Sequence, residues 1–252
     1  MLAINTDRIW WMPPDGALHG AAIDRLMWWN LVAPSALFLF AHIFLVAALM
    51  RRKKRAPEKV ELSMKWELIP LGALVLVYAW MAVSAQRLWA AIRYQGPAPQ
   101  ALQVEVTGMQ FQWYFRYAGA DAVFGSTRPE LINAPAGNPL GLDRTDPHSA
   151  DDVVSSVLVL PAGREVDLGI RSIDVIHGFF IPGMRLKQNA VPGMEMHVHF
   201  TPAVPGDYPI LCSQVCGLGH ARMQAHLRVV PEGEYAVWLA SHEPHTVDGA
   251  AR

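Results

Sequence analysis

Two cysteines, one histidine and one methionine lie within a single twelve-residue segment, from Cys212 to Met223. Thiolate, imidazole and thioether groups are soft ligands that select copper over hard cations. One cysteine with a histidine and an axial methionine would make a mononuclear blue-copper site, but here a second thiolate follows four residues after the first. Two sulfurs can bridge two metal ions, and each ion then needs a terminal imidazole. Because the segment supplies only His220, a second histidine must come from elsewhere in the chain.

His177 is the candidate for the missing imidazole, because it follows a strand-like run and has apolar neighbours that would shield a metal ion. A simpler interpretation competes with this one. Two cysteines in a domain outside the cytoplasm usually form a disulfide, and a histidine beside phenylalanine is usually a packed core residue. The spacing of His220 and Met223 after the cysteines favours the metal site. The chain has no other cysteine, and it contains no CxxCH motif for covalent haem.

The segments that must position these residues begin after Gly96, Pro97 and Pro99, where the composition becomes that of a water-exposed domain built from strands. Short runs of alternating or clustered apolar residues are separated by turn signals, which favours a small sandwich or barrel. The expected strands cover Val104 and Val106 and residues 110–117, 153–160, 165–170, 194–200 and 225–230. Residues 118–152 show no periodicity and are expected to form a long loop, and residues 232–239 a short helix.

Two apolar stretches precede this domain, at residues 31–50 and 68–92. About 20 apolar residues suffice for a helix to cross a hydrocarbon core about 30 Å thick. The composition agrees, since 52% of the residues are hydrophobic and 17% charged. The basic loop at residues 51–65 is of the kind retained on the cytoplasmic side. We therefore expect a hairpin of helices at about 26–50 and 67–93, with both ends outside. Basic residues bunched in one loop argue against a nucleic-acid surface.

These segments resemble subunit II of the haem-copper oxidases. The likeness covers the helical hairpin, the aromatic run at 110–117, the sequence Asp174-Val175-Ile176-His177 and the whole cysteine segment. It implies a two-helix transmembrane hairpin in residues 1–98 and an extracytoplasmic, all-β cupredoxin-like domain, a Greek-key β-sandwich or barrel, in residues 99–252. The family's soluble domain holds a dinuclear copper centre, CuA. By this resemblance Cys212 and Cys216 bridge the coppers, His177 and His220 are terminal ligands, Met223 is a weak ligand to one copper, and the carbonyl oxygen of Gln214 serves the other.

The resemblance also implies a function, that of electron relay in a cytochrome c oxidase. Such a subunit accepts electrons from reduced cytochrome c and passes them to haem in subunit I, where oxygen is reduced to water in a proton-translocating complex. Subunit I, subunit III, the cytochrome donor and the lipid membrane are the expected partners. The expected location is a bacterial-type plasma membrane, with both termini and the copper domain on its periplasmic side.

Two alternatives stay open for the function. One is the CuA subunit of a nitric oxide reductase, which would share the anchor and the copper site and differ in its partner subunit. The other is a membrane-tethered copper-binding or copper-delivery protein. Delivery proteins favour exposed and labile sites, whereas this chain clusters five ligands in one loop.

Departures from the family pattern change some of these expectations. Gln214 stands where many members have a Glu whose side chain helps hold a magnesium ion at the subunit I interface, so magnesium is in doubt here. Phe111 stands where a tryptophan often receives the electron, so Phe111 and Trp113 are the candidate aromatic contacts. Asp174 matches an acidic residue that docks a basic donor, but Asn189 replaces another, so the donor is expected to be less basic.

Other residues with chemical potential carry weaker hypotheses. His197 and His199 share one face of an expected strand, where a metal pair is less favoured than an ordinary strand. His42, in the first span, is expected to hydrogen-bond to a partner subunit. Glu61 or Glu67, near the cytoplasmic end of the second span, could serve a proton channel, as a subunit II carboxylate does in some members.

Overall fold

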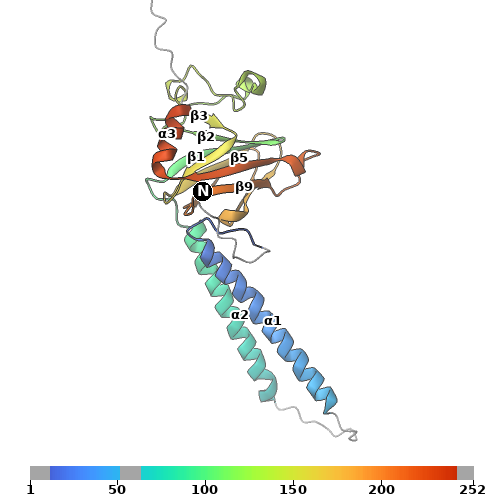
Figure 1. The fold of residues 1–252 in the computed structure, drawn as a ribbon. Helices are drawn as coiled ribbons and strands as arrows, with labels where there is room; N and C mark the ends of the chain where they lie inside the picture. Colours follow the sequence, from blue (N-terminus) through green and yellow to red (C-terminus); the bar gives the residue numbers. More distant parts are fainter. Residues whose placement is uncertain (1–11, 52–63, 243–252) are drawn as a thin grey trace, which may run out of the picture. The chain divides into compact units, whose positions relative to one another are not determined.

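The computed structural model describes residues 12–51 and 64–242. The chain divides into two compact units: Ala21–Gln95 forms one, and Met1–Gly20 together with Gly96–Arg252 forms the other. The first unit is helical, and the second holds all the strands of the described residues (Figure 1). Most of the basic loop, with Glu61, lies outside the described residues.

Two long, predominantly apolar helices make up the first unit, α1 Gly20–Met50 and α2 Met64–Arg93. With 31 and 30 residues, each is long enough to cross a membrane. The helices begin before residues 26 and 67, because helical backbone continues through polar residues that an apolar run excludes. The rings of Trp29 and Trp80 meet edge to face between the helices, with centroids 5.7 Å apart.

Two polar residues of these helices, His42 and Glu67, carry hypotheses from the sequence. In α1, Nδ1 of His42 lies 2.8 Å from the carbonyl oxygen of Phe38, one turn earlier, and the two rings pack together. The imidazole is therefore already hydrogen-bonded within its own helix. Glu67 lies in the first turn of α2 and is exposed, where a carboxylate complements the helix dipole.

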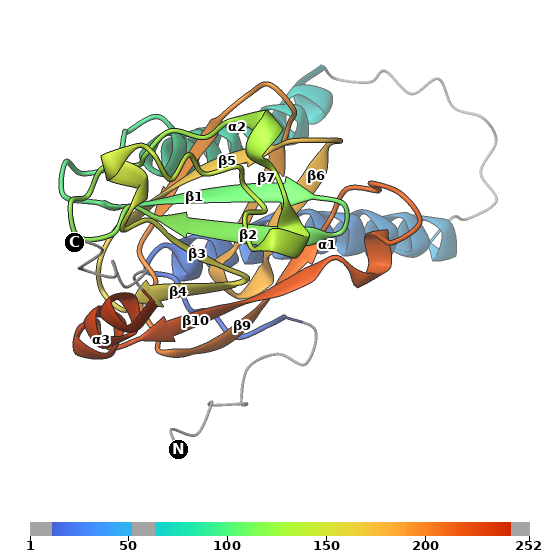
Figure 2. The same cartoon turned by 90° about the horizontal axis from the view of Figure 1, so that it is seen from above.

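The β unit consists of two five-stranded sheets packed face to face (Figure 2). The first sheet has the order β3-β2-β1-β5-β8, with β1 Leu102–Met109, β2 Gln112–Tyr117, β3 Val153–Ser155, β5 Val166–Ser172 and β8 Met196–Phe200. The second has the order β4-β10-β9-β6-β7, with β4 Val157–Pro161, β6 His177–Ile181, β7 Leu186–Ala190, β9 Gly206–Cys212 and β10 Gln224–Val230. Neighbouring strands are antiparallel except β1 with β5 and β4 with β10.

The core between the sheets follows the two-residue period of the strands. Val104 and Val106 of β1 point inward and are at most 1% exposed. Three aromatic side chains of β2 also point inward, and Phe179 of β6 packs edge-on against two of them, Trp113 and Phe115. The expected short C-terminal helix is confirmed as α3 Glu232–His242, which lies beside β4 (Figure 2).

Two features of the sheets differ from the sequence expectation. Residues 153–160, expected as one strand, divide between β3 and β4, which belong to different sheets. The hydroxyl of Ser155 bonds to both the N–H and the carbonyl of Val157, a local turn that ends one strand and starts the next. β6, β7 and β9 were not predicted, because they are short and carry little alternation of polar and apolar residues.

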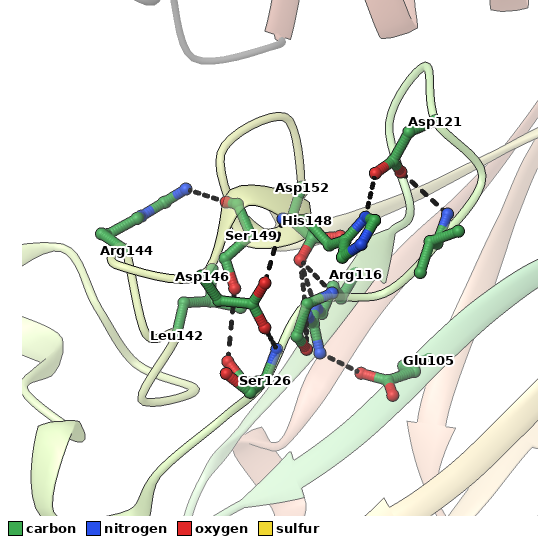
Figure 3. A network of polar contacts seen from close by, with 12 residues as sticks. Glu105, Arg116, Asp121, Ser126, Leu142, Arg144, Asp146, His148, Ser149 and Asp152 are labelled. Atoms are coloured by element: carbon green, nitrogen blue, oxygen red, sulfur yellow. Dashed lines mark hydrogen bonds and ion pairs between the residues drawn. The ribbon is translucent and has the colours of Figure 1, made fainter.

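The expected long loop at residues 118–152 is a compact insert with three short 3₁₀ turns. Hydrogen bonds and ion pairs between polar side chains stabilise the insert, which lacks a periodic apolar pattern (Figure 3). Arg116 of β2, 1% exposed, forms ion pairs with Asp152 of the insert and with Glu105 of β1. The Asp146 carboxylate accepts the N–H of Ser126. Such contacts leave no periodicity in the sequence, so the order of this segment could not be predicted.

An N-terminal strap, residues 13–18, runs along the β unit. The N–H of Gly16 donates to the Gly183 carbonyl at 2.8 Å, and the Gly16 carbonyl accepts from Ala203 at 2.7 Å. Ala17 pairs with Pro202 and is buried in the core. A side chain at position 16 would collide with the ring of Tyr208, so glycine permits this close approach.

Candidate metal centre

Three neighbouring strands position the ligand-type residues at one end of the second sheet. β9 ends at Cys212, the loop 213–219 follows, a short 3₁₀ turn carries His220, and β10 begins after Met223. β6 begins at His177 and pairs with β9. In that register Phe179 lies opposite Cys212. Adjacent strands therefore bring His177 beside the cysteine loop across more than 30 residues of sequence.

The six predicted ligand residues converge around the two sulfurs. A ring nitrogen of His177 and both Sγ atoms lie within 4.8 Å of one another. The Cys212 and Cys216 sulfurs are 3.8 Å apart, and Nδ1 of His220 and Sδ of Met223 lie 3.7 and 3.8 Å from the Cys216 sulfur. The carbonyl oxygen of Gln214 lies 3.2 Å from the Cys212 sulfur. Both cysteines are free thiols, so the disulfide alternative is not the state that the structure describes.

The cluster is shielded from water on its inner side. His177 and Met223 are completely buried and Cys216 is 6% exposed, whereas Cys212 is half-buried. Burial raises the pKa of the Cys216 thiol to about 11, and the adjacent Cys212 sulfur adds to the shift. Without a metal the thiol therefore keeps its proton, which a metal ion would displace on binding.

His177 provides the test of whether this site suits a metal ion. Its Nε2 donates to Oδ1 of Asp174 at 2.8 Å, while its Nδ1 is buried without a hydrogen-bond partner. Buried ring nitrogens are almost always paired, and a metal-ligating histidine typically donates its other N–H to a carboxylate. The unpaired nitrogen, the soft donor set and the tethering carboxylate together fit a copper site.

Asp174 stays ionised beside this imidazole. Burial raises the pKa of its carboxyl, but hydrogen bonds from Gln110, His177 and Val175 outweigh burial and hold the pKa below its usual value. The carboxylate thus fixes the tautomer and the orientation of the His177 ring. Sequence reasoning had assigned Asp174 to donor docking and missed this contact, although its position three residues before the histidine was a usable signal.

The backbone around His177 is packed too tightly for a side chain. A Cβ at Gly108 of β1 would lie 2.9 Å from Cδ2 of His177 and 3.0 Å from Cζ3 of Trp113. The Trp113 indole meets the His177 ring edge-on, with centroids 5.8 Å apart. Gly108 was not singled out from the sequence, because the sequence does not show which side chain packs against a glycine within a strand.

The two predicted aromatic contacts occupy different places. Trp113 is fully buried behind His177, so its ring has no outer surface for a partner. Phe111, at the tip of the β1–β2 hairpin, is 38% exposed, and its ring lies against the cysteine loop at Gly217 and Gly219. Of these two rings, Phe111 is the one that both contacts the loop and is exposed.

His197 and His199, the other candidate histidine pair, do not form a metal site in the structure. Nδ1 of His197 lies 2.9 Å from Asp167, and Nε2 lies 3.4 Å from Glu195, so carboxylates engage both nitrogens of this ring. Within the described parts of the chain, His177, Cys212 and Cys216 form the one group of three or more histidine, cysteine or acidic residues close enough to share an ion.

Comparisons with known proteins identify relatives of this chain. The alternative cytochrome c oxidase subunit 2 of Bradyrhizobium diazoefficiens is 40% identical over 141 residues, which cover 55% of this chain and 50% of that protein. Cytochrome c oxidase subunit 2 of Cereibacter sphaeroides is 28% identical over 229 residues, 83% of this chain and 72% of that one. The chain thus spans about half the length of the Bradyrhizobium relative.

Among solved structures, the periplasmic domain of subunit II of cytochrome oxidase from Bradyrhizobium japonicum is 28% identical. It covers 57% of this chain and 95% of its own, with a TM-score of 0.42. A family model for the periplasmic domain of cytochrome c oxidase subunit II matches residues 102–230, half of the chain. With the two apolar helices and the cupredoxin-like β domain both confirmed, the chain belongs to the cytochrome c oxidase subunit II family.

Proposed function

We propose that this chain is the electron-accepting copper subunit of a haem-copper oxidase, most specifically a cytochrome c oxidase. The observation that carries the proposal is the unpaired, buried Nδ1 of His177 beside two free thiols. Membership of the subunit II family supports it independently.

The residues that would hold two copper ions are those gathered at the loop. Cys212 and Cys216 would bridge the ions, with His177 and His220 as terminal ligands. Met223 and the Gln214 carbonyl complete the set, since both already lie against a cysteine sulfur. Two coppers held in this way supply a one-electron redox couple shared through the thiolates.

The contribution of the protein is to hold these side chains rigidly and to exclude water from them. Trp113 packs behind His177, Phe179 packs against Trp113, and the Asp174 carboxylate holds the His177 ring. Strand pairing between β6 and β9 sets the separation of the two ligand-bearing segments. A site with so little freedom changes geometry little when its charge changes, which favours fast electron transfer.

We propose a haem protein such as cytochrome c as the donor and subunit I as the acceptor, with oxygen reduced there. Phe111 is the surface group through which a docked donor would reach the loop. The two apolar helices are proposed as membrane spans, with the basic loop cytoplasmic and the β unit periplasmic. No feature of the described residues favours nitric oxide as the acceptor or a copper-delivery role.

The test is metal analysis of the full chain purified in detergent. We expect two coppers per chain and an electron paramagnetic resonance signal from one electron shared by two copper nuclei. Gln214→Ala should keep both coppers, because the backbone oxygen remains, whereas Cys216→Ser should abolish the centre, because a hydroxyl is a far weaker bridge. One copper per chain with a blue mononuclear spectrum would refute the dinuclear site. Purifying the associated haem subunit and comparing oxygen and nitric oxide consumption identifies the acceptor.

A further inference from the structure

Gln110, at the tip of the β1–β2 hairpin, makes two short hydrogen bonds to the candidate metal centre. Its backbone N–H donates to Oδ2 of Asp174 at 2.6 Å. Its side-chain Nε2 donates to the carbonyl oxygen of Cys216, also at 2.6 Å. The partners are 64 and 106 residues away in sequence, so one residue joins three separate segments.

These bonds complete a continuous connection between two ligand residues. Oδ1 of Asp174 accepts from Nε2 of His177, and Oδ2 of the same carboxylate accepts from Gln110. Gln110 then reaches Cys216. The imidazole of His177 and the backbone carbonyl of Cys216 are therefore linked through three hydrogen bonds, two of which involve a carboxylate and are the stronger kind.

The cysteine loop needs such an external support. Val215 and Leu218, in its middle, are exposed and contribute nothing to the core. Gly217 has φ +137°, a conformation suited to glycine, and a Cβ there would lie 3.0 Å from Nε2 of Gln110. The start of the loop is anchored by the Ser213 N–H on the Gly178 carbonyl. Gln110 supplies the corresponding anchor at Cys216.

We infer that Gln110 is a positioning residue that fixes Cys216 relative to His177. The amide is required because the position needs a donor toward a carbonyl oxygen. A glutamate of the same shape would point an acceptor at that oxygen and place a second negative charge near Asp174. An asparagine is one methylene shorter and does not reach. The role toward copper rests on the proposed function, but the restraint on the loop does not.

The test compares Gln110→Leu and Gln110→Glu with a matched control, Gln112→Leu. Gln112 has the same side chain on the same hairpin, is exposed, and lies within bonding distance of Tyr114 on its own strand. In the metal-free full chain in detergent, hydrogen–deuterium exchange of residues 212–220 should be about tenfold faster in both Gln110 variants, the effect of losing one hydrogen bond. The control should match the unsubstituted chain.

A second measurement follows copper-loaded chains during challenge with a copper chelator. Both Gln110 variants should lose copper faster and show a shifted absorption spectrum, while Gln112→Leu should do neither. Equal exchange in the loop for Gln110 and Gln112 variants overturns the inference. If Gln110→Leu also loses exchange protection in β10, that variant has unfolded. The exchange of the loop in the isosteric variant Gln110→Glu then decides whether the inference holds. A chain that binds no copper refutes the proposed function alone, since the exchange experiment still judges the restraint.

Discussion

Adding one methyl group at Gly108 should damage the metal site through the ring of His177. The new Cβ would lie 2.9 Å from Cδ2 of His177, whereas ordinary contact begins at 3.4 Å, so the ring must move by about 0.5 Å. Metal–ligand distances tolerate deviations of about 0.2 Å. The ring cannot move freely, because Asp174 holds Nε2 and the Trp113 ring packs edge-on with it.

We therefore expect Gly108→Ala to reduce copper affinity by roughly 10–100-fold, the usual effect of disturbing a group that orients a ligand. Overpacking should also lower the stability of the metal-free β unit by about 1–3 kcal/mol. Competitive copper titration and scanning calorimetry of the full chain in detergent measure the two effects. The φ of Gly108 is not in the left-handed region, so backbone strain does not confuse the result.

Gly169→Ala on β5, in the same sheet, is the matched control. Its Cβ would lie 2.8 Å from Oε1 of Glu195, which is an equally short approach. The Glu195 carboxylate ends a flexible and 46% exposed side chain, so it can move aside at little cost. Copper binding should be unchanged. If Gly108→Ala binds copper as tightly as the unsubstituted chain, or if both variants lose affinity equally, the close packing of His177 does not control the site.

Three further predictions concern the rest of the β unit. Arg116→Met leaves the carboxylate of Asp152 buried without its partner and should lower the free energy of unfolding, measured by calorimetry, by roughly 3–5 kcal/mol. Arg228→Met, at the exposed pair with Asp207, should lower it by less than about 1 kcal/mol. Similar losses in the two variants would contradict the weight given to burial. A fragment starting at residue 99 lacks the N-terminal strap and should melt at a lower temperature than one supplied with a peptide of residues 12–20; identical melting would show that the strap is dispensable. The hydrogen bond between His148 and Asp121 raises the pKa of His148 and lowers that of Asp121, so the contribution of His148 is lost as pH rises through its raised folded pKa and that of Asp121 as pH falls through its lowered one. The insert should resist proteolysis best between about pH 4.5 and 6.5. His148→Gln should remove the loss of resistance on the alkaline side, while the acid-side loss remains because Val123 also lowers the pKa of Asp121; a variant that retains the alkaline loss would contradict the assignment.

The sequence by itself determined the chemistry of the site and the division of the chain. The soft side chains proposed as ligands, at positions 212, 216, 220 and 223, are close in sequence, so any loop that joins them brings them together, whatever the fold. The two apolar helices were equally predictable, because their length and composition are local properties. The proposed dinuclear coordination requires a second histidine, and His177 was the candidate with suitable neighbours.

Only the tertiary structure decided what holds the ligands in place. Asp174, Gln110 and Gly108 act on His177 and Cys216 from separate strands and loops, and such contacts depend on register and packing, which leave no local pattern. The same reason explains why the order of the insert and the division of residues 153–160 between two sheets were not foreseen. Ligand identity is a local property of the chain, whereas the rigidity of the ligand geometry arises from long-range hydrogen bonds that only the folded chain forms.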